Sequence, residues 1–324
     1  MGRGGVGRGW SVAEIPSLTG RRALVTGANS GIGFYAALEL ARKGAHVLLG
    51  ARDSARGEAA VAKIRAEVQG ADVELLLLDL ASLEQVRAVA EAELVRGEGL
   101  DVLINNAGVM APKTRELTAD GFEMQFGVNV LGHFALTALL MPTLERAAER
   151  SAAAPRVVTI ASIAHKRGRI DFEDLQSAKH YDAMAAYRQS KLADLMFALE
   201  MDRRLRTAGS RVMSVAAHPG VAQTPLFLRA EHKGMERLVR SGLGVAIRLF
   251  LNTGADGAVP TLFAATAPEA ESGGYYGPQG YEEMRGGDVG PAMIAEQARD
   301  QQAAARLWSE CERLTGVKLL SPNG

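Results

Sequence analysis

The chain has 324 residues, which is long for one hydrophobic core and short for two full domains. Apolar residues make up 47% and charged residues 23% of it, as in ordinary soluble globular proteins, and Lys+Arg and Asp+Glu are equal at 37 each. The chain therefore has no net charge that would attract nucleic acid or an anionic membrane. Its single cysteine, Cys311, excludes an intramolecular disulfide framework and a cysteine-rich metal site.

The sequence pattern predicts neither a membrane span nor an N-terminal export signal. No apolar run approaches the roughly 20 residues that span a bilayer, and the N-terminal stretch MGRGGVGRGW has arginines but no apolar core of a signal peptide. We therefore expect a flexible extension over residues 1–19, no transmembrane segment and a cytoplasmic protein. Cys311 is expected as a partly buried thiol in a C-terminal helix.

Short apolar runs alternate with stretches of helical length from Arg21 to about Ala217. The runs are RALVTG, AHVLLG, VELLLLDL, LDVLINNAG, RVVTIAS and RVMSVAAHPG, and the stretches of helical length cover 31–43, 54–68, 82–96, 119–148 and 181–207. Apolar runs without polar alternation suit strands that are buried on both faces. The repeated order predicts an α/β fold of the Rossmann type, a doubly wound parallel sheet with helices on both faces, as a single domain over 20–324.

The alternation stops after residue 220. The stretch TPLFLRAEHKGMERLVRSGLGVAIRLFLNTG places apolar residues at irregular helical spacing with five basic residues among them. It follows the carboxyl end of a strand, where open α/β sheets bind ligands. A substrate cover over about 222–253, plain surface helices and a membrane-facing patch all fit this pattern.

A glycine-rich turn joins the first predicted strand to the first predicted helix. In LVTGANSGIGFYAALELARKG, Gly27, Gly31 and Gly33 permit tight backbone geometry and close approach of a pyrophosphate to the helix N-terminus. This position between strand and helix is the one that a dinucleotide-binding loop requires. The candidate cofactor contacts in the loop are Gly27, Asn29, Ser30, Gly31, Ile32 and Gly33.

Three motifs together resemble a known family. TGANSGIG, NNAG at 105–108 and Tyr187-x-x-x-Lys191 resemble the classical short-chain dehydrogenase/reductase family over roughly residues 20–280. The stretches WSVAEIPSLTGRRALVTGANSGIG, AYRQSKLA and GGYYGPQGYEEMRGG resemble its retinol-dehydrogenase-like branch. The resemblance implies an enzyme that transfers a hydride between a nicotinamide cofactor and a carbonyl or alcohol group. It implies further cofactor contacts at Asp79, Leu80, Asn106, Ala107, Gly108, Tyr187, Lys191, Pro219, Gly220, Val221 and Thr224.

Some of these residues have plainer interpretations as well. Asn105, the first residue of NNAG, matches a position that steadies the central sheet in the family. Asp79 fits equally well as a polar strand end near a helix cap, and His165 and His218, which flank the site, are expected to be structural. No metal-ligand cluster is visible.

The end of the second predicted strand, AHVLLGARD, indicates which nicotinamide cofactor is used. Enzymes that prefer NAD present a carboxylate there to the ribose 2′-hydroxyl, whereas this chain has Ala51 followed by Arg52, whose guanidinium suits a 2′-phosphate. We interpret Asp53 as the N-cap of the helix that begins immediately after it. Ser30 stands where family members that favour NADP often carry a second basic residue. The prediction is NADP(H) over NAD(H).

Tyr187 and Lys191 lie four residues apart in AYRQSKLADL, so a helix places both on one face. A free tyrosine has a pKa of about 10, and an ammonium about 4 Å away stabilises its phenolate by about 4 kcal/mol at an effective dielectric near 20. The pair suits proton exchange with a carbonyl oxygen, with Tyr187 as acid/base and Lys191 as the group that tunes it. Such pairs also occur on ordinary amphipathic helices, and it is the resemblance that favours catalysis.

Two further residues complete the implied catalytic set. Ser162 follows the fifth predicted strand, twenty-five residues before Tyr187, and would hydrogen-bond the substrate oxygen. Many relatives have another serine where this chain has Ala161. Asn129, in VNVLGHF, matches the asparagine that in the family holds a water linking the lysine to solvent. The sequence fits equally well an asparagine in a helix whose side chain hydrogen-bonds to backbone.

The substrate and the assembly follow less directly. The apolar residues of 226–251, with Val109 and Met110, predict a pocket for a bulky hydrophobic ketone, aldehyde or alcohol. Family members assemble through long helices such as 119–148 and 181–207, which predicts a homodimer or homotetramer. The alternatives are a catalytically silent NADP-binding sensor or scaffold and a light-driven tetrapyrrole reductase. The latter relies on cysteines near the substrate, whereas Cys311 lies far from the predicted site. Extended-type nucleotide-sugar epimerases are disfavoured by the glycine spacing and the short C-terminal part.

Overall fold

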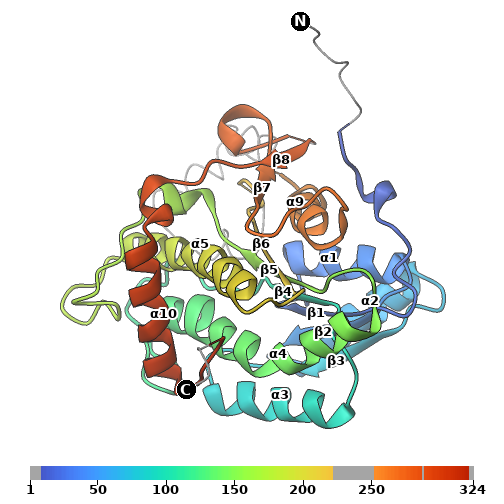
Figure 1. Ribbon diagram of the computed structural model, residues 1–324, viewed down its shortest axis with the longest axis horizontal. Coiled ribbons are helices and arrows are strands. Elements are labelled where there is room, and N and C mark those ends of the chain that lie inside the picture. The colour runs from blue at the N-terminus through green and yellow to red at the C-terminus, as the bar shows by residue number, and fades with distance from the viewer. Residues whose placement is uncertain (1–8, 222–251, 287, 321–324) are drawn as a thin grey trace, which may run out of the picture.

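The computed structural model describes residues 9–221, 252–286 and 288–320, and the described part is built on an eight-stranded sheet (Figure 1). The strand order is β3-β2-β1-β4-β5-β6-β7-β8, and only the β7–β8 pairing is antiparallel. The strands are β1 (Arg22–Thr26), β2 (His46–Ala51), β3 (Val73–Leu77), β4 (Val102–Asn105), β5 (Arg156–Ile160), β6 (Met213–Ala217), β7 (Tyr275–Pro278) and β8 (Val289–Pro291). This topology confirms the predicted doubly wound parallel sheet.

Helices cover both faces of the sheet (Figure 1). One face carries α3 (Leu83–Arg96), α4 (His133–Arg150) and α5 (Ala183–Thr207), and α10 (Gln301–Thr315) packs against α5. The other face carries α1 (Gly31–Arg42), α2 (Ser54–Glu67) and α9 (Gly254–Thr266). Because the strand order reverses between β1 and β4, a crevice opens there at the carboxyl edge of the sheet.

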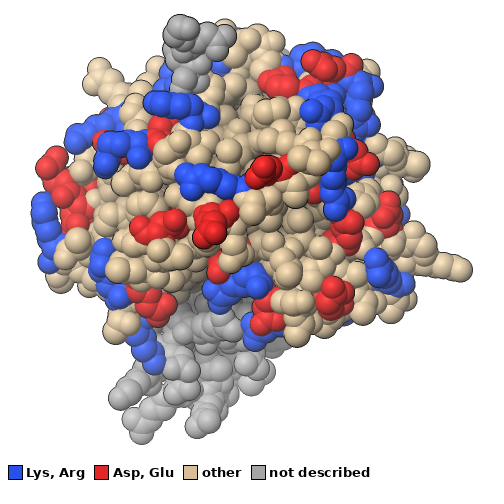
Figure 2. Space-filling view, turned by 90° about the horizontal axis from the view of Figure 1, so that it is seen from below, with Lys and Arg blue, Asp and Glu red and all other residues tan. Residues whose placement is uncertain are grey.

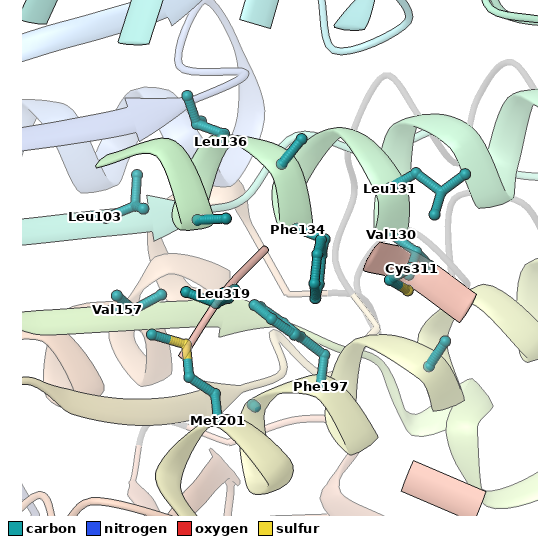
Figure 3. Packing of buried hydrophobic residues seen from close by; sticks show 14 of the residues in the cluster. Leu103, Val130, Leu131, Phe134, Leu136, Val157, Phe197, Met201, Cys311 and Leu319 are labelled. Carbon is teal, nitrogen blue, oxygen red and sulfur yellow. The ribbon is translucent and has the colours of Figure 1, made fainter. Parts of the chain in front are cut away.

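Each face of the sheet has its own hydrophobic core, because successive strand residues point to opposite faces. Leu24 belongs to the core under α3, α4 and α5, and its neighbour Val25 belongs to the core under α1, α2 and α9. In Figure 3, Phe134 of α4 and Phe197 of α5 point toward one another, and their ring centroids lie 5.7 Å apart. Trp308 of α10 stacks on Phe197, so the C-terminal helix closes this core.

The helix boundaries follow the prediction closely, except in the fourth segment. There the stretch expected as helix from residue 119 begins as a π-helix, η2 (Phe126–Gly132), and continues as α4 to Arg150. Residues before it form a turn instead, because Leu117 pairs with Glu123 in an isolated bridge and Gly121 adopts φ +84°. The helix expected from residue 181 begins at Ala183, where the Asp182 side chain caps it.

Described residues near both ends of the chain pack against the rest of the fold. Ile15 and Leu18, within the expected N-terminal extension, are buried, and Trp10 packs edge-on against Phe263 of α9. Near the C-terminus, Cys311 lies in α10 as expected and is fully buried rather than partly. The expected substrate cover lies outside the described residues, except for residues 252–253 at its end.

The segment Phe126–Arg150 is long and apolar enough to cross a membrane by length and composition. However, 89% of its most apolar window is buried inside the fold, as for a core helix of a globular protein. On the face shown in Figure 2, basic and acidic side chains are interspersed, in keeping with their equal numbers.

Candidate active site

A cavity of about 1700 Å³ lies at the carboxyl edge of the sheet, beside the crevice between β1 and β4. It collects most of the residues predicted from the sequence. The predicted residues that line it are Gly27, Asn29, Ser30, Gly31, Ile32, Arg52, Asp79, Leu80, Asn106, Ala107, Gly108, Ser162, Tyr187, Lys191, Pro219, Gly220 and Val221. Gly33 and Asn129 do not line the cavity, and Thr224 lies outside the described residues.

The glycine loop between β1 and α1 fits a dinucleotide phosphate group. Gly27 adopts φ +66°, and a Cβ there would lie 2.9 Å from the Ala107 Cα, so only glycine is accommodated without strain. A Cβ on Gly33 would lie 2.4 Å from the Asn106 Nδ2 atom. The Ser30 side chain does not cap α1, and the cavity wall includes Gly31 and Ile32, so the amide-rich start of the helix is available to an anion.

Two arginines stand at the end of β2, where the ribose 2′ position of a bound dinucleotide is expected. Arg52 and Arg56 are exposed and both line the cavity. Asp53 is the N-cap of α2, since its Oδ1 atom accepts a hydrogen bond from the Arg56 backbone N–H at 2.9 Å, as predicted. Sequence reasoning missed Arg56, although its place in the first turn of α2, four residues after Arg52, was readable.

Asp79 and Leu80 line the cavity beyond β3. The Asp79 Oδ1 atom accepts a hydrogen bond from the Ala81 backbone N–H at 2.9 Å. This hydrogen bond fits the interpretation of Asp79 as a polar strand end near a helix cap. It does not exclude contact with an adenine, because the residue still borders the cavity.

A buried hydrogen-bond hub holds the NNAG segment against β1. The Thr26 Oγ1 atom accepts hydrogen bonds from the backbone N–H groups of Asn106 and Ala107, both at 2.9 Å, and lies 2.9 Å from the His133 Nε2 atom. Burial, and less strongly Lys191, lowers the pKa of His133 to about 4, so its ring is neutral at physiological pH. Nothing in the sequence connected Thr26 to His133, which lies 107 residues further on.

Asn105 and Asn129 are both buried and hydrogen-bonded. Asn105 is buried and its Nδ2 atom donates to the Thr137 Oγ1 atom of α4, so this residue ties β4 to its covering helix. Asn129 lies in the π-helix η2, a conformation frequently found at functional sites. Its side chain accepts from and donates to the Val109 backbone and also donates to the Ser190 Oγ atom at 2.9 Å. Its proposed role in holding a water stays a prediction.

Ser162, Tyr187 and Lys191 all line the cavity. Ser162 follows β5 and caps the short helix η3 (Ile163–Arg167), and its Oγ atom accepts from the Ala164 backbone N–H at 3.2 Å. Tyr187 and Lys191 come from successive turns of α5 and are only 8% and 5% exposed. The three side chains thus border the same space as the glycine loop, within one cavity.

Lys191 is held by two acceptors. Its Nζ atom donates to the Ile160 carbonyl oxygen at the end of β5 and to the Asp194 Oδ2 atom, both at 2.8 Å. Burial opposes the charge on Lys191, but Asp194 and Tyr187 outweigh it and raise the pKa of the lysine. Asp194 was not predicted, although an acid three residues after a lysine on a helix is a recognisable spacing.

Polar contacts around Lys166 and Glu283 stabilise another part of the cavity wall. Lys166 donates to a Glu283 carboxylate oxygen at 2.8 Å, and the His218 Nε2 atom lies 3.5 Å from the same oxygen. The nearby His218 ring and then the Lys166 ammonium, opposed by burial, lower the pKa of Glu283 to about 2. The His165 Nδ1 atom lies 2.7 Å from the Ser162 carbonyl oxygen. Both histidines therefore have the structural contacts expected of them.

The lining of the cavity is also rich in methionine. Among the described residues, five methionines line it. They are Met110, Met124, Met184, Met284 and Met293. Because methionine is unbranched and flexible, such a wall adapts to irregular apolar ligands. Among the described residues, no group of three His, Cys, Asp or Glu side chains could hold a metal ion.

Comparison with known proteins identifies the family. A family model described as short chain dehydrogenase matches residues 21–233. The chain is 42% identical to retinol dehydrogenase 13 of Mus musculus over 314 residues, which cover 95% of this chain and 87% of the relative. The chain therefore belongs to the short-chain dehydrogenase/reductase family, in its retinol-dehydrogenase-like branch, and is an oxidoreductase of the type that acts on CH–OH groups with NAD(P).

Other relatives agree with this assignment. The chain is 43% identical to polyprenol dehydrogenase of Mus musculus over 305 residues, which cover 94% of this chain and 86% of the relative. Among solved structures, an uncharacterised protein of Mycobacterium paratuberculosis is similar with a TM-score of 0.76 and 39% identity over 96% of this chain and 99% of the other. A protein of Beutenbergia cavernae, assigned as an NAD(P)-dependent gluconate 5-dehydrogenase and holding NADP at low occupancy, gives 0.60 and 30% over 80% and 95%.

Proposed function

We propose that this protein is an NADP(H)-dependent enzyme that reversibly reduces a bulky hydrophobic ketone or aldehyde to its alcohol. The observation that carries the proposal is that Ser162, Tyr187 and Lys191 line the same cavity as the glycine loop. That arrangement brings a proton donor and a hydroxyl next to the space where a dinucleotide would lie.

Bound NADPH would supply the hydride. Ser162 would donate a hydrogen bond to the substrate oxygen and hold the carbonyl in place. Tyr187 would give its hydroxyl proton to that oxygen as negative charge develops, and would take it back during alcohol oxidation. Lys191, fixed by the Ile160 carbonyl and Asp194, would stabilise the phenolate that Tyr187 leaves behind.

The preference for NADP(H) rests on Arg52 and Arg56, two guanidinium groups that line the cavity at the end of β2, beside Asp53, whose carboxylate caps α2. Fluorescence titration with NADPH and NADH tests it. Replacing Arg52 or Arg56 with Ala should weaken NADPH binding by about tenfold or more and leave NADH binding nearly unchanged, because a charge-assisted hydrogen bond is lost. Tighter binding of NADH by the unchanged protein would contradict the proposal.

The proposal of a hydrophobic substrate is based on the methionines that line the cavity. The names of two relatives, a retinol dehydrogenase and a polyprenol dehydrogenase, support it. The test is NADPH oxidation with a panel that runs from long-chain and cyclic apolar aldehydes and ketones to polar sugars. We expect turnover to rise with apolar character. A preference for sugars would overturn the substrate class, and tight NADPH binding without turnover of any compound would favour a cofactor-binding sensor.

A further inference from the structure

The charge of Lys191 is balanced by a buried carboxylate on its own helix. Asp194 lies three residues further along α5, and its Oδ2 atom is 2.8 Å from the Lys191 Nζ atom. The two residues are only 5% and 3% exposed, so water screens the pair weakly. A neighbouring phenol therefore experiences the field of an ion pair and not that of an isolated ammonium.

Asp194 is the carboxylate that balances Lys191, because the other titratable groups packed against the pair are neutral near pH 7. His133, from α4, has its pKa lowered to about 4 by burial, and less strongly by Lys191. Cys311, from α10, is fully buried, and burial raises the pKa of its thiol far above the usual range. Neither group can replace or cancel the charge of Asp194.

Among the described residues near Tyr187, several titratable groups are uncharged or already paired. Burial raises the pKa of Tyr275, from β7, well above its ordinary value, and burial lowers the pKa of His165, from η3. Lys166 and Glu283 form an ion pair with each other at the cavity wall. Arg167 and Arg188 also line the cavity, but they are exposed and half-buried, so water screens them more than it screens the buried pair of Lys191 and Asp194.

We infer that Asp194 is a positioning residue that sets the charge which Tyr187 experiences. By balancing Lys191, it weakens the stabilisation that the lysine gives to a phenolate at Tyr187 and adapts the site to carbonyl reduction rather than alcohol oxidation. The carboxylate also fixes the lysine, since Nζ is tied at once to Asp194 and to the Ile160 carbonyl oxygen. The inference rests on the proposed role of Tyr187 as acid/base.

An ultraviolet difference titration of the tyrosinate tests this inference without any substrate. Each protein is titrated beside its Tyr187→Phe version, and the difference reports Tyr187 alone. Asp194→Asn should move the midpoint about one pH unit lower, the order expected for removing one nearby negative charge. Asp194→Glu, which keeps the charge but changes the shape, should leave the midpoint in place.

The matched control is Asp202→Asn, which removes a carboxylate from another ion pair on α5, with Arg206. It should leave the midpoint unchanged. If Asp194→Asn does not fold, Asp194→Ser provides a smaller neutral side chain that leaves room for water beside Lys191. A midpoint that stays in place in the neutral variants would show a merely structural role for Asp194. A rise would show that Asp194 mainly keeps Lys191 charged. Either result would overturn the inference.

Turnover separates this inference from the proposed function. If the enzyme oxidises an alcohol, the alkaline rise of kcat/KM should shift to lower pH in Asp194→Asn by the same amount as the titration midpoint. Absence of turnover with every compound would overturn the proposed function and leave the titration result standing.

Discussion

The buried His133 should make the folded state sensitive to acid. Its Nδ1 atom lies 2.9 Å from the Asn129 carbonyl oxygen and its Nε2 atom 2.9 Å from the Thr26 hydroxyl. A neutral ring with the proton on Nδ1 satisfies both contacts, because Nδ1–H donates to the carbonyl and Nε2 accepts from Thr26. A second proton would place two donors in a site that is built for one.

The magnitude follows from the difference in proton affinity. The pKa of His133 is 6.5 for an exposed ring and about 4 in the fold, so between these values the unfolded chain binds more protons than the folded one. The free energy of unfolding therefore falls as the pH drops from 6.5 to 4, by about 3 kcal/mol from this residue alone. Above pH 6.5 the contribution is fully present.

Urea unfolding at a series of pH values between 7.5 and 4 measures this loss in the unchanged protein and in His133→Asn. The variant should be less stable at pH 7.5, because it loses two buried hydrogen bonds, but its stability should fall less on acidification. His180→Asn, which changes an exposed histidine, should retain the full acid sensitivity. Asp194, whose pKa burial raises to about 6, is common to all three proteins and cancels in the comparison. Equal slopes for His133→Asn and the unchanged protein would refute the reasoning.

Three further predictions use other parts of the fold. Gly33→Ala should weaken dinucleotide binding by about tenfold or more, measured by fluorescence titration, because a Cβ would lie 2.4 Å from Asn106 Nδ2 and displace the loop. Phe134→Ala should lower the free energy of unfolding by about 3–5 kcal/mol in urea, since its ring is fully buried between α4, α5 and α10. In the unchanged protein, the Glu283 carboxylate stabilises the fold above pH 4.5, and this stabilisation is lost as the pH falls toward 2. Glu283→Gln should lack it and be less stable by about 1 kcal/mol above pH 4.5, a small effect because solvent screens the contacts with His218 and Lys166. Thermal unfolding across that pH range measures the difference.

The sheet and the glycine loop were readable because local chemistry determines them. Unbroken apolar runs such as those around Val25 and Val158 suit strands buried on both faces, and Gly27 occupies a turn that excludes a side chain. The N-cap role of Asp53 was readable for the same reason, since a cap acts within three residues.

What could not be predicted depends on contacts between residues far apart in the chain. Thr26 and His133 are 107 residues apart, and Lys166 and Glu283 are 117 apart, so no spacing rule connects them. The late start of the fourth helix follows from the bridge between Leu117 and Glu123, which has no apolar signature. The cytoplasmic location and the homodimer or homotetramer stay predictions.

The most direct test of the central claim is Tyr187→Phe, measured for NADPH binding by fluorescence and for carbonyl reduction by NADPH oxidation with the best compound of the panel. Removing one hydroxyl should leave binding nearly intact and lower turnover by about 10²- to 10⁴-fold, because the proton donor is lost. Tyr181→Phe is the control, since its hydroxyl donates to the Pro112 carbonyl oxygen and does not line the cavity. Turnover that survives in Tyr187→Phe would contradict the assigned mechanism.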